Sequence, residues 1–162
     1  MKRTLLPVLA LLAGCGGAPR DAKPAPTTEG EPADSPEARC LALATTPRTP
    51  TAGASERITV QHVLVRHAES KGSGPQPARS RGQACLRALE ARDKILAGED
   101  FAAIVTGYSD EPGAATRDGS VGAITRQDVV PAFADAAFAL SIQQLSDLVE
   151  TEFGFHLILR TQ

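Results

Sequence analysis

Residues 58–67, Ile-Thr-Val-Gln-His-Val-Leu-Val-Arg-His, decide the fold because they are the strongest strand signal in the chain. Side chains alternate between the faces of a strand, which puts His62, Leu64 and Arg66 on one face and Val63, Val65 and His67 on the other. Residues 154–160, Gly-Phe-His-Leu-Ile-Leu-Arg, form a second strand-like run near the end of the chain. If the two strands pair, His62 and His156 can meet. His67 is expected at the surface or at an edge.

Composition places the globular part in the C-terminal portion. The chain has 162 residues, a net charge of −2 and 22% charged residues, which suits one domain with an additional segment. This balance gives no electrostatic case for a nucleic-acid partner. Every Phe and the one Tyr lie between residues 101 and 155, whereas seven of the twelve prolines lie between residues 19 and 50. We therefore expect a domain over residues 57–162.

The first residues resemble a bacterial lipoprotein signal. Met1-Lys2-Arg3 is basic, residues 5–13 form an apolar run too short to span a bilayer, and Leu-Ala-Gly precedes Cys15. The resemblance implies removal of residues 1–14 and lipidation of Cys15 (a palmitate-bearing membrane anchor). Gly16 after the cysteine favours the periplasmic side of the outer membrane if the host is Gram-negative. The alternative is an ordinary secretory signal with a cysteine near its cleavage site.

Residues 15–56 are expected to form a tether. They are rich in Pro, Ala, Thr and charge, lack aromatic residues, and bury too little apolar surface to offset chain entropy. Within them, Ser35 is placed to cap a short helix that runs through Leu43. An exported chain meets an oxidising environment, so Cys40 and Cys85 either form a disulfide or remain an exposed thiol and a core thiol.

The remaining elements predict an α+β domain. A helix is expected over residues 79–97, with an apolar stripe at Gly82, Cys85, Leu86, Leu89 and Leu96. A second helix follows the capping residue Asp100, with Phe101, Ile104, Val105 and Tyr108 on its buried face. After an irregular segment we expect a strand at 121–124, a helix at 131–140, and strands at 148–151 and 155–160. The order β-α-α-β-α-β-β favours an antiparallel sheet with helices packed on it.

Five segments together resemble the parvulin-type peptidyl-prolyl isomerases, also called rotamases. They are His62-Val-Leu-Val65, Phe101-Ala-Ala-Ile-Val105 with Ser109-Asp110, Gly119-Ser-Val-Gly122, Phe133-Ala-Asp-Ala-Ala-Phe-Ala-Leu140 and Gly154-Phe-His-Leu-Ile158. Their order and spacing extend the resemblance over residues 57–162. It implies a four-stranded antiparallel sheet surrounded by helices, and a shallow cleft that takes a Xaa-Pro bond.

The resemblance also implies roles for particular residues. The positions that match catalytic residues of the family are His62, His156, Glu111, Ser109 and Thr151. The positions that match its substrate-binding residues are Leu64, Arg66, Val121, Val129 and Phe133. Glu111 stands where the family often has Cys or Asp, and Phe153 where Ser is common. The implied partners are unfolded or proline-containing exported polypeptides, for which the domain would serve as a folding catalyst.

Two other functions fit parts of the sequence. Arg66-His67 resembles the Arg-His start of the histidine phosphatases, but only 95 residues follow His67, which is too few for that fold. A non-catalytic, chaperone-like module that binds proline-containing segments is the stronger alternative. No cofactor is expected. No metal is expected either, because the chain has no pair of histidines at i and i+4 with an acidic neighbour and no closely spaced cysteine pair.

Overall fold

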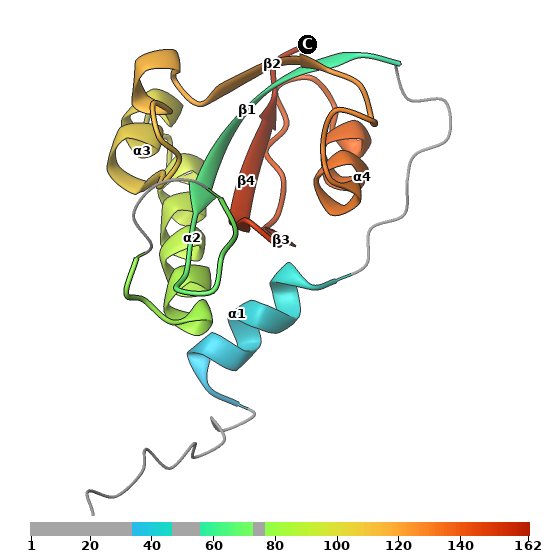
Figure 1. Ribbon diagram of the computed structural model, residues 1–162. Helices are drawn as coiled ribbons and strands as arrows, with labels where there is room; N and C mark the ends of the chain where they lie inside the picture. Colours follow the sequence, from blue (N-terminus) through green and yellow to red (C-terminus); the bar gives the residue numbers. More distant parts are fainter. Residues whose placement is uncertain (1–33, 47–55, 73–76) are drawn as a thin grey trace, which may run out of the picture. The chain divides into compact units, whose positions relative to one another are not determined.

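The computed structural model describes residues 34–46, 56–72 and 77–162, which build an antiparallel sheet with helices on both faces (Figure 1). The helices are α1 (Pro36–Ala44), α2 (Arg81–Leu96), α3 (Phe101–Tyr108) and α4 (Pro131–Ala139), with a short 3₁₀ helix, η1 (Ala115–Arg117). The strands are β1 (Ile58–Val65), β2 (Ser120–Ile124), β3 (Val149–Thr151) and β4 (Gly154–Arg160). From β1 onward, this order of helices and strands confirms the predicted α+β fold.

β1 is a central strand of the sheet, whose order is β2-β1-β4-β3 with every neighbour antiparallel. The two strands predicted to pair, β1 and β4, run side by side with Val63 opposite Leu157. A register shift between Val60 and Gln61 interrupts the pairing of β1 with β2. Because side chains alternate along each strand, the sheet has two distinct faces.

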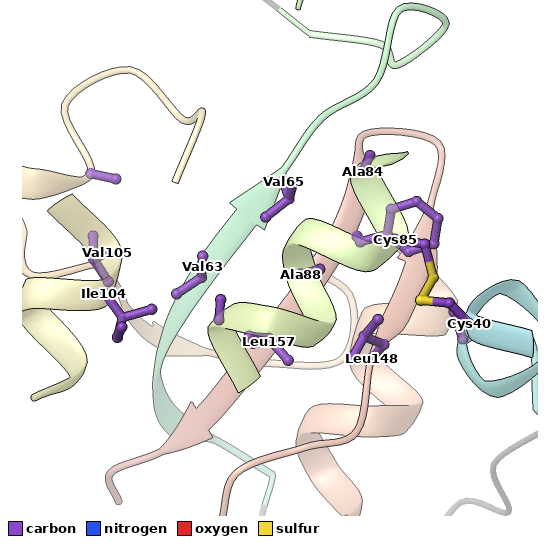
Figure 2. Close-up of a cluster of buried hydrophobic side chains, with 14 residues drawn as sticks. Cys40, Val63, Val65, Ala84, Cys85, Ala88, Ile104, Val105, Leu148 and Leu157 are labelled. Carbon is purple, nitrogen blue, oxygen red and sulfur yellow. A yellow bond between two sulfur atoms is a disulfide. The ribbon is translucent and has the colours of Figure 1, made fainter. Parts of the chain in front are cut away.

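One face of the sheet is covered by α2 and α3 (Figure 2). Val63, Val65, Phe155 and Leu157 point from the strands into this core. The buried side of α2 is made by small residues, Ala84, Cys85, Ala88 and Ala91, which let the helix approach the sheet closely. The predicted stripe was wrong at Leu96, which is 61% exposed. Leu86 and Leu89 of the predicted stripe are partly buried and pack against this core, so the prediction fails only at the end of the helix.

The other face is covered by α4. Pro131 occupies the first helical position, where a missing N–H costs nothing, and the helix buries most of its alanines together with Phe133 and Phe138. These side chains pack against Ile58 and Val60 of β1 and Ile158 of β4. Because even-numbered positions of β1 and β4 share this face, it is also the face that carries both site histidines.

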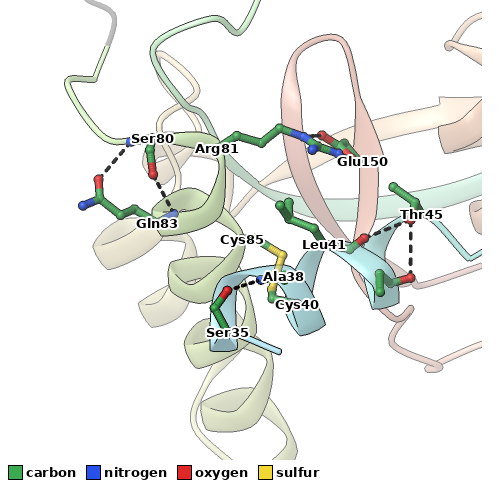
Figure 3. Close-up of a disulfide and its surroundings, with 11 residues drawn as sticks. Ser35, Ala38, Cys40, Leu41, Thr45, Ser80, Arg81, Gln83, Cys85 and Glu150 are labelled. Carbon is green, nitrogen blue, oxygen red and sulfur yellow. Dashed lines mark hydrogen bonds and ion pairs between the residues drawn. A yellow bond between two sulfur atoms is a disulfide. The ribbon is translucent and has the colours of Figure 1, made fainter. Parts of the chain in front are cut away.

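A disulfide joins α1 to α2, since Cys40 and Cys85 are bonded and both are buried (Figure 3). Ser35 caps α1 by accepting a hydrogen bond from the Ala38 amide at 3.0 Å, as predicted. The segment expected as a tether therefore contains a helix that is packed against the domain. Its remaining residues, apart from 34, 35, 45, 46 and 56, and the whole signal with Cys15 lie outside the described residues.

The expectation for His67 was wrong. Its side chain is buried, the ring packs 6.2 Å from that of Phe155, and Nδ1 accepts the Glu69 amide at 3.3 Å. The chain folds back over this position in the loop after β1, where the Ala68 amide donates to the Arg79 carbonyl. Alternation placed His67 on its face correctly but could not show what covers it.

Among the described helices, none is long and apolar enough to cross a bilayer.

Candidate active site

His62 on β1 and His156 on β4 meet on the face that α4 covers. Leu64 lies opposite His156 in the ladder, so the two histidines are diagonal neighbours. Their Nδ1 atoms are 3.2 Å apart, and the rings stack with centroids separated by 5.5 Å. Both side chains are buried, at 6% and 4% exposure. The pairing inferred from the two strand patterns is thus present as a direct contact.

Phe133 of α4 packs against both histidine rings from the helix that covers this face of the sheet. Its ring meets both imidazoles edge-on, with centroid distances of 5.8 Å to His62 and 5.3 Å to His156. An edge-to-face arrangement is one of the two favoured geometries for aromatic rings. The helix therefore supplies an apolar wall directly against the two polar rings.

The outer nitrogen of each histidine also has a partner. Thr151 Oγ1 lies 2.7 Å from His156 Nε2 and accepts the Phe153 amide at 3.1 Å. Glu111 Oε2 lies 2.9 Å from His62 Nε2, and Arg117 donates to the same oxygen at 2.5 Å. A continuous polar chain thus runs from the β3–β4 turn through both rings to η1.

The charge states in this chain follow from its contacts. The hydrogen bond from His62, followed by the charges of His62 and Arg117, lowers the pKa of Glu111 below its ordinary value. Burial, and next the neighbouring His62, lowers the pKa of His156 well below its ordinary value. Glu111 is therefore an ionised acceptor at neutral pH and His156 is neutral. Because an ionised carboxylate can only accept, His62 Nε2 carries a hydrogen and donates the hydrogen bond to Glu111.

Two cavities adjoin at this site. One, of about 250 Å³, is lined by His62, Leu64, Arg66, Lys71, Gly72, Glu111, Pro112, Phe153 and His156. The second, of about 450 Å³, is lined by Gln127, Asp128, Val129, Val130 and Phe153. Phe153 borders both, so an extended ligand passing from one cavity to the other would run along its ring.

The structure places the remaining predicted site residues in different surroundings. Ser109 contacts neither imidazole within the described contacts; its hydroxyl accepts the Leu64 amide at 3.2 Å and so fixes the edge of β1. Arg66 is buried, and its guanidinium donates to the carbonyls of Lys71 and Gly72. Val121 is 38% exposed on β2 and borders neither of these two cavities, as far as their described lining goes.

Backbone geometry supports the position of His62. Gly119 has a φ of 71°, its carbonyl accepts the His62 amide at 2.8 Å, and a Cβ at this position would come within 2.4 Å of the His62 carbonyl oxygen. Only glycine can hold the chain so close to β1 in this conformation. The loop that carries Glu111 and Arg117 is therefore brought back against the strand next to the histidine.

Sequence reasoning missed Arg117, Pro112 and Gly72 as components of the site. Arg117 lies six residues beyond Glu111, and the 3₁₀ turn between them is a local feature that hydrophobic periodicity does not reveal. The signal available was the sequence Thr-Arg-Asp-Gly at 116–119, where a basic residue precedes a turn within reach of an acidic side chain.

Comparison with known proteins agrees with this arrangement. The family described as "Rotamase: PPIC-type PPIASE domain" matches residues 62–162. The foldase protein PrsA of Halalkalibacterium halodurans is 40% identical over 74 residues, covering 46% of this chain and 22% of the relative. The chaperone SurA of Chromohalobacter salexigens is 38% identical over 99 residues, covering 61% of this chain and 21% of the relative. The matched region thus spans about a fifth of the length of these relatives.

Solved structures resemble the same region. A peptidylprolyl isomerase (PrsA) from Bacillus cereus superposes with a TM-score of 0.54 and 30% identity, over 67% of this chain and 36% of that one. The parvulin NmPin of Nitrosopumilus maritimus gives a TM-score of 0.51 and 29% identity, over 68% of this chain and 100% of that one. The fold and the histidine site define a parvulin-type domain. The chain belongs to the PpiC-type peptidyl-prolyl isomerase (rotamase) family.

Proposed function

We propose that this chain is a peptidyl-prolyl cis/trans isomerase that assists the folding of exported proteins. The observation that carries the proposal is the buried histidine pair, with the Nδ1 atoms of His62 and His156 3.2 Å apart, packed against the ring of Phe133 beside two adjoining cavities. A polypeptide with a Xaa-Pro bond would lie across Phe153, with one cavity on each side of it. The foldase and chaperone relatives support exported polypeptides as substrates.

The chemistry required is rotation about one bond. The barrier of about 18–20 kcal/mol comes from conjugation of the amide, and no covalent intermediate is needed to lower it. The twisted amide is less conjugated and less polar than the planar one, so apolar surroundings favour it. Each preference of about 1.4 kcal/mol for the twisted form raises the rate tenfold.

We assign the residues to two roles on this basis. Phe133 and Val129 bind the proline ring, while Leu64 and Arg66 border the neighbouring part of the substrate. Val121, which borders neither cavity, receives no contact in this assignment. His62, His156, Thr151 and Glu111 keep the floor of the cleft in one arrangement through their hydrogen bonds. Ser109 acts at one remove, by holding β1 to the loop that carries Glu111.

A non-catalytic Pro-peptide binding module is the second candidate, favoured by Glu111 and Phe153 in positions where the family often has other residues. The full exported chain should be added to a proline-limited refolding reaction, which takes tens of seconds or more unaided. A concentration-dependent rate gain supports the isomerase. Suppressed aggregation at an unchanged refolding rate supports the binding module.

We further propose that the domain is anchored in the cell envelope through lipid on Cys15, on the periplasmic side of the outer membrane in a Gram-negative host. The basic start, the short apolar run and the Leu-Ala-Gly-Cys sequence at 12–15 support this anchor. The Cys40–Cys85 disulfide supports export, because such bonds persist in oxidising compartments. The proposed organisation is a signal at 1–14, a lipidated segment at 15–56 whose helix α1 is bonded to the domain through Cys40, and the isomerase domain at 57–162.

A further inference from the structure

Arg117 is bound at three points beside the site. Its guanidinium donates to Glu111 Oε2 at 2.5 Å, to the Ser120 carbonyl at 3.0 Å and to the Pro112 carbonyl at 3.3 Å. His62 Nε2 meets the same Glu111 oxygen at 2.9 Å. Two donors on one oxygen hold the carboxylate in a single orientation, although 40% of the Arg117 side chain is exposed.

We propose that Arg117 is a positioning residue for the histidine pair: it holds Glu111 as an anion turned toward His62 and so determines which ring nitrogens carry protons. It does not touch the substrate in this scheme. The consequence for catalysis rests on the proposed isomerase function, whereas the consequence for the protons does not.

When both rings are neutral, all hydrogen bonds of this chain must run in the same donor-to-acceptor direction. Glu111 accepts from His62 Nε2, which leaves His62 Nδ1 as an acceptor. His156 Nδ1 must then donate to it, so His156 Nε2 accepts the hydroxyl proton of Thr151. The Thr151 oxygen in turn accepts the Phe153 amide. Every proton points toward Glu111, and the ionised carboxylate is the group that fixes this direction.

Other charged groups near Glu111 do not replace Arg117. Arg66 and Lys71 border the same cavity, but Arg66 donates to backbone carbonyls and Lys71 Nζ is paired with Glu152 at 2.7 Å. Of the two imidazoles, only His62 contacts the carboxylate, at the same oxygen as Arg117. Without Arg117, Glu111 would be protonated at higher pH, and a protonated carboxyl can donate to His62 and reverse the chain.

The test uses the full chain labelled with ¹⁵N in its histidine rings. Nitrogen shifts report the tautomer of each imidazole, and the isomerase rate is measured over a pH series. In Arg117→Gln we expect mixed tautomers at His62 and His156, and an acid limb of the rate profile that moves to higher pH. Arg117→Lys, which keeps the charge but not the three-point contact, should restore both readouts at least in part.

Arg92→Gln is the matched control, because Arg92 also makes a 2.6 Å ion pair, with Asp147, away from the histidines. It should leave both readouts unchanged. Wild-type tautomers together with an unshifted profile in Arg117→Gln would overturn the proposal. If that variant does not fold, Glu111→Leu decides, since leucine offers no acceptor to His62 Nε2; unchanged tautomers there overturn the proposal too. If the wild-type chain does not accelerate isomerisation at all, the isomerase function is refuted, but the tautomer assignment is not.

Discussion

The Nδ1 atoms of His62 and His156 lie 3.2 Å apart, although 94 residues separate the two histidines in sequence. At this distance the two nitrogens can share one proton, but two protons would face each other. The pair therefore tolerates at most one positive charge. Burial of both rings adds a desolvation cost to that charge.

The first prediction concerns stability against pH. The pKa of His156 is lowered in the folded chain, so the unfolded chain binds its proton first as pH falls through about 6.5. The free energy of unfolding should therefore decrease on acidification, by up to about 1.4 kcal/mol per pH unit for one proton. The lowered pKa of Glu111 acts in the same direction at more acidic pH.

Urea unfolding at a series of pH values between 8 and 5 measures this slope. His156→Leu should flatten the profile above pH 5, because the unfolded chain no longer has that proton to gain. A slope that persists unchanged in the variant would show that another group, and not His156, carries the dependence.

The sheet and the histidine pair could be predicted because both follow from local pattern. Alternation put His62 and His156 on one face of each strand, and the spacing of the strands allowed them to pair. Other features depend on contacts that no pattern encodes. Burial of His67 depends on the loop after β1, and the position of Arg117 depends on a single 3₁₀ turn.

The same reasoning explains the mixed outcome for α2 and α1. The exposed Leu96 was expected to be buried because apolar character alone was weighed, whereas small side chains decide how closely a helix packs on a sheet. The helix α1 was predictable from its capping residue, Ser35. Its attachment to α2 involves the disulfide between Cys40 and Cys85. From sequence, the disulfide was one of two alternatives, because spacing does not determine cysteine pairing.

The second prediction concerns that disulfide. It closes a loop of 45 residues, for which loop-closure entropy in the unfolded chain corresponds to about 2–4 kcal/mol. Replacing both cysteines by serine should lower the free energy of unfolding by about this amount. Isomerase activity at low temperature should be retained, because α1 packs on α2 and the histidines lie on the opposite face of the sheet.

Denaturant unfolding of wild type with and without reductant gives the comparison, with thiol counting after denaturation as the control for bond formation. Two reactive thiols at positions 40 and 85 in the exported protein would contradict the bond. An equal midpoint for oxidised and reduced chains would contradict its stabilising role.

The third prediction concerns Phe133. Truncation to Ala would remove a buried ring and destabilise the domain by about 3–5 kcal/mol, so the milder change Phe133→Leu is the better probe. Leucine cannot meet both imidazoles edge-on, and we expect turnover to fall about tenfold, equivalent to about 1.4 kcal/mol in the barrier. Phe138→Leu is the matched control, since Phe138 is buried on the same helix and stacks with Arg126. If both variants lose turnover equally, the effect is general and the cleft is misplaced.

The fourth prediction concerns Cys15, which lies outside the described residues. Cys15→Ser removes the thiol that the lipid requires, so the protein should move from the membrane fraction to the soluble fraction. Cys40→Ser keeps Cys15 and should stay with the membrane. Membrane association of the Cys15 variant that survives carbonate washing would refute the lipid anchor.

The last prediction concerns the residue that precedes proline. Isomerases that require a phosphorylated side chain there need Arg or Lys groups aimed at the ligand, because phosphate is best held by charge-assisted hydrogen bonds. Here Arg66 donates to the carbonyls of Lys71 and Gly72, and Lys71 is paired with Glu152, while Glu111 places a carboxylate at the cavity. We therefore expect faster isomerisation when Leu or Arg precedes proline than when phosphoserine does. A peptide series differing only at that position measures it, and Glu111→Gln should narrow the difference by removing the like charge. A faster rate for the phosphoserine peptide would contradict the prediction and make Arg66 and Lys71 the phosphate-binding groups.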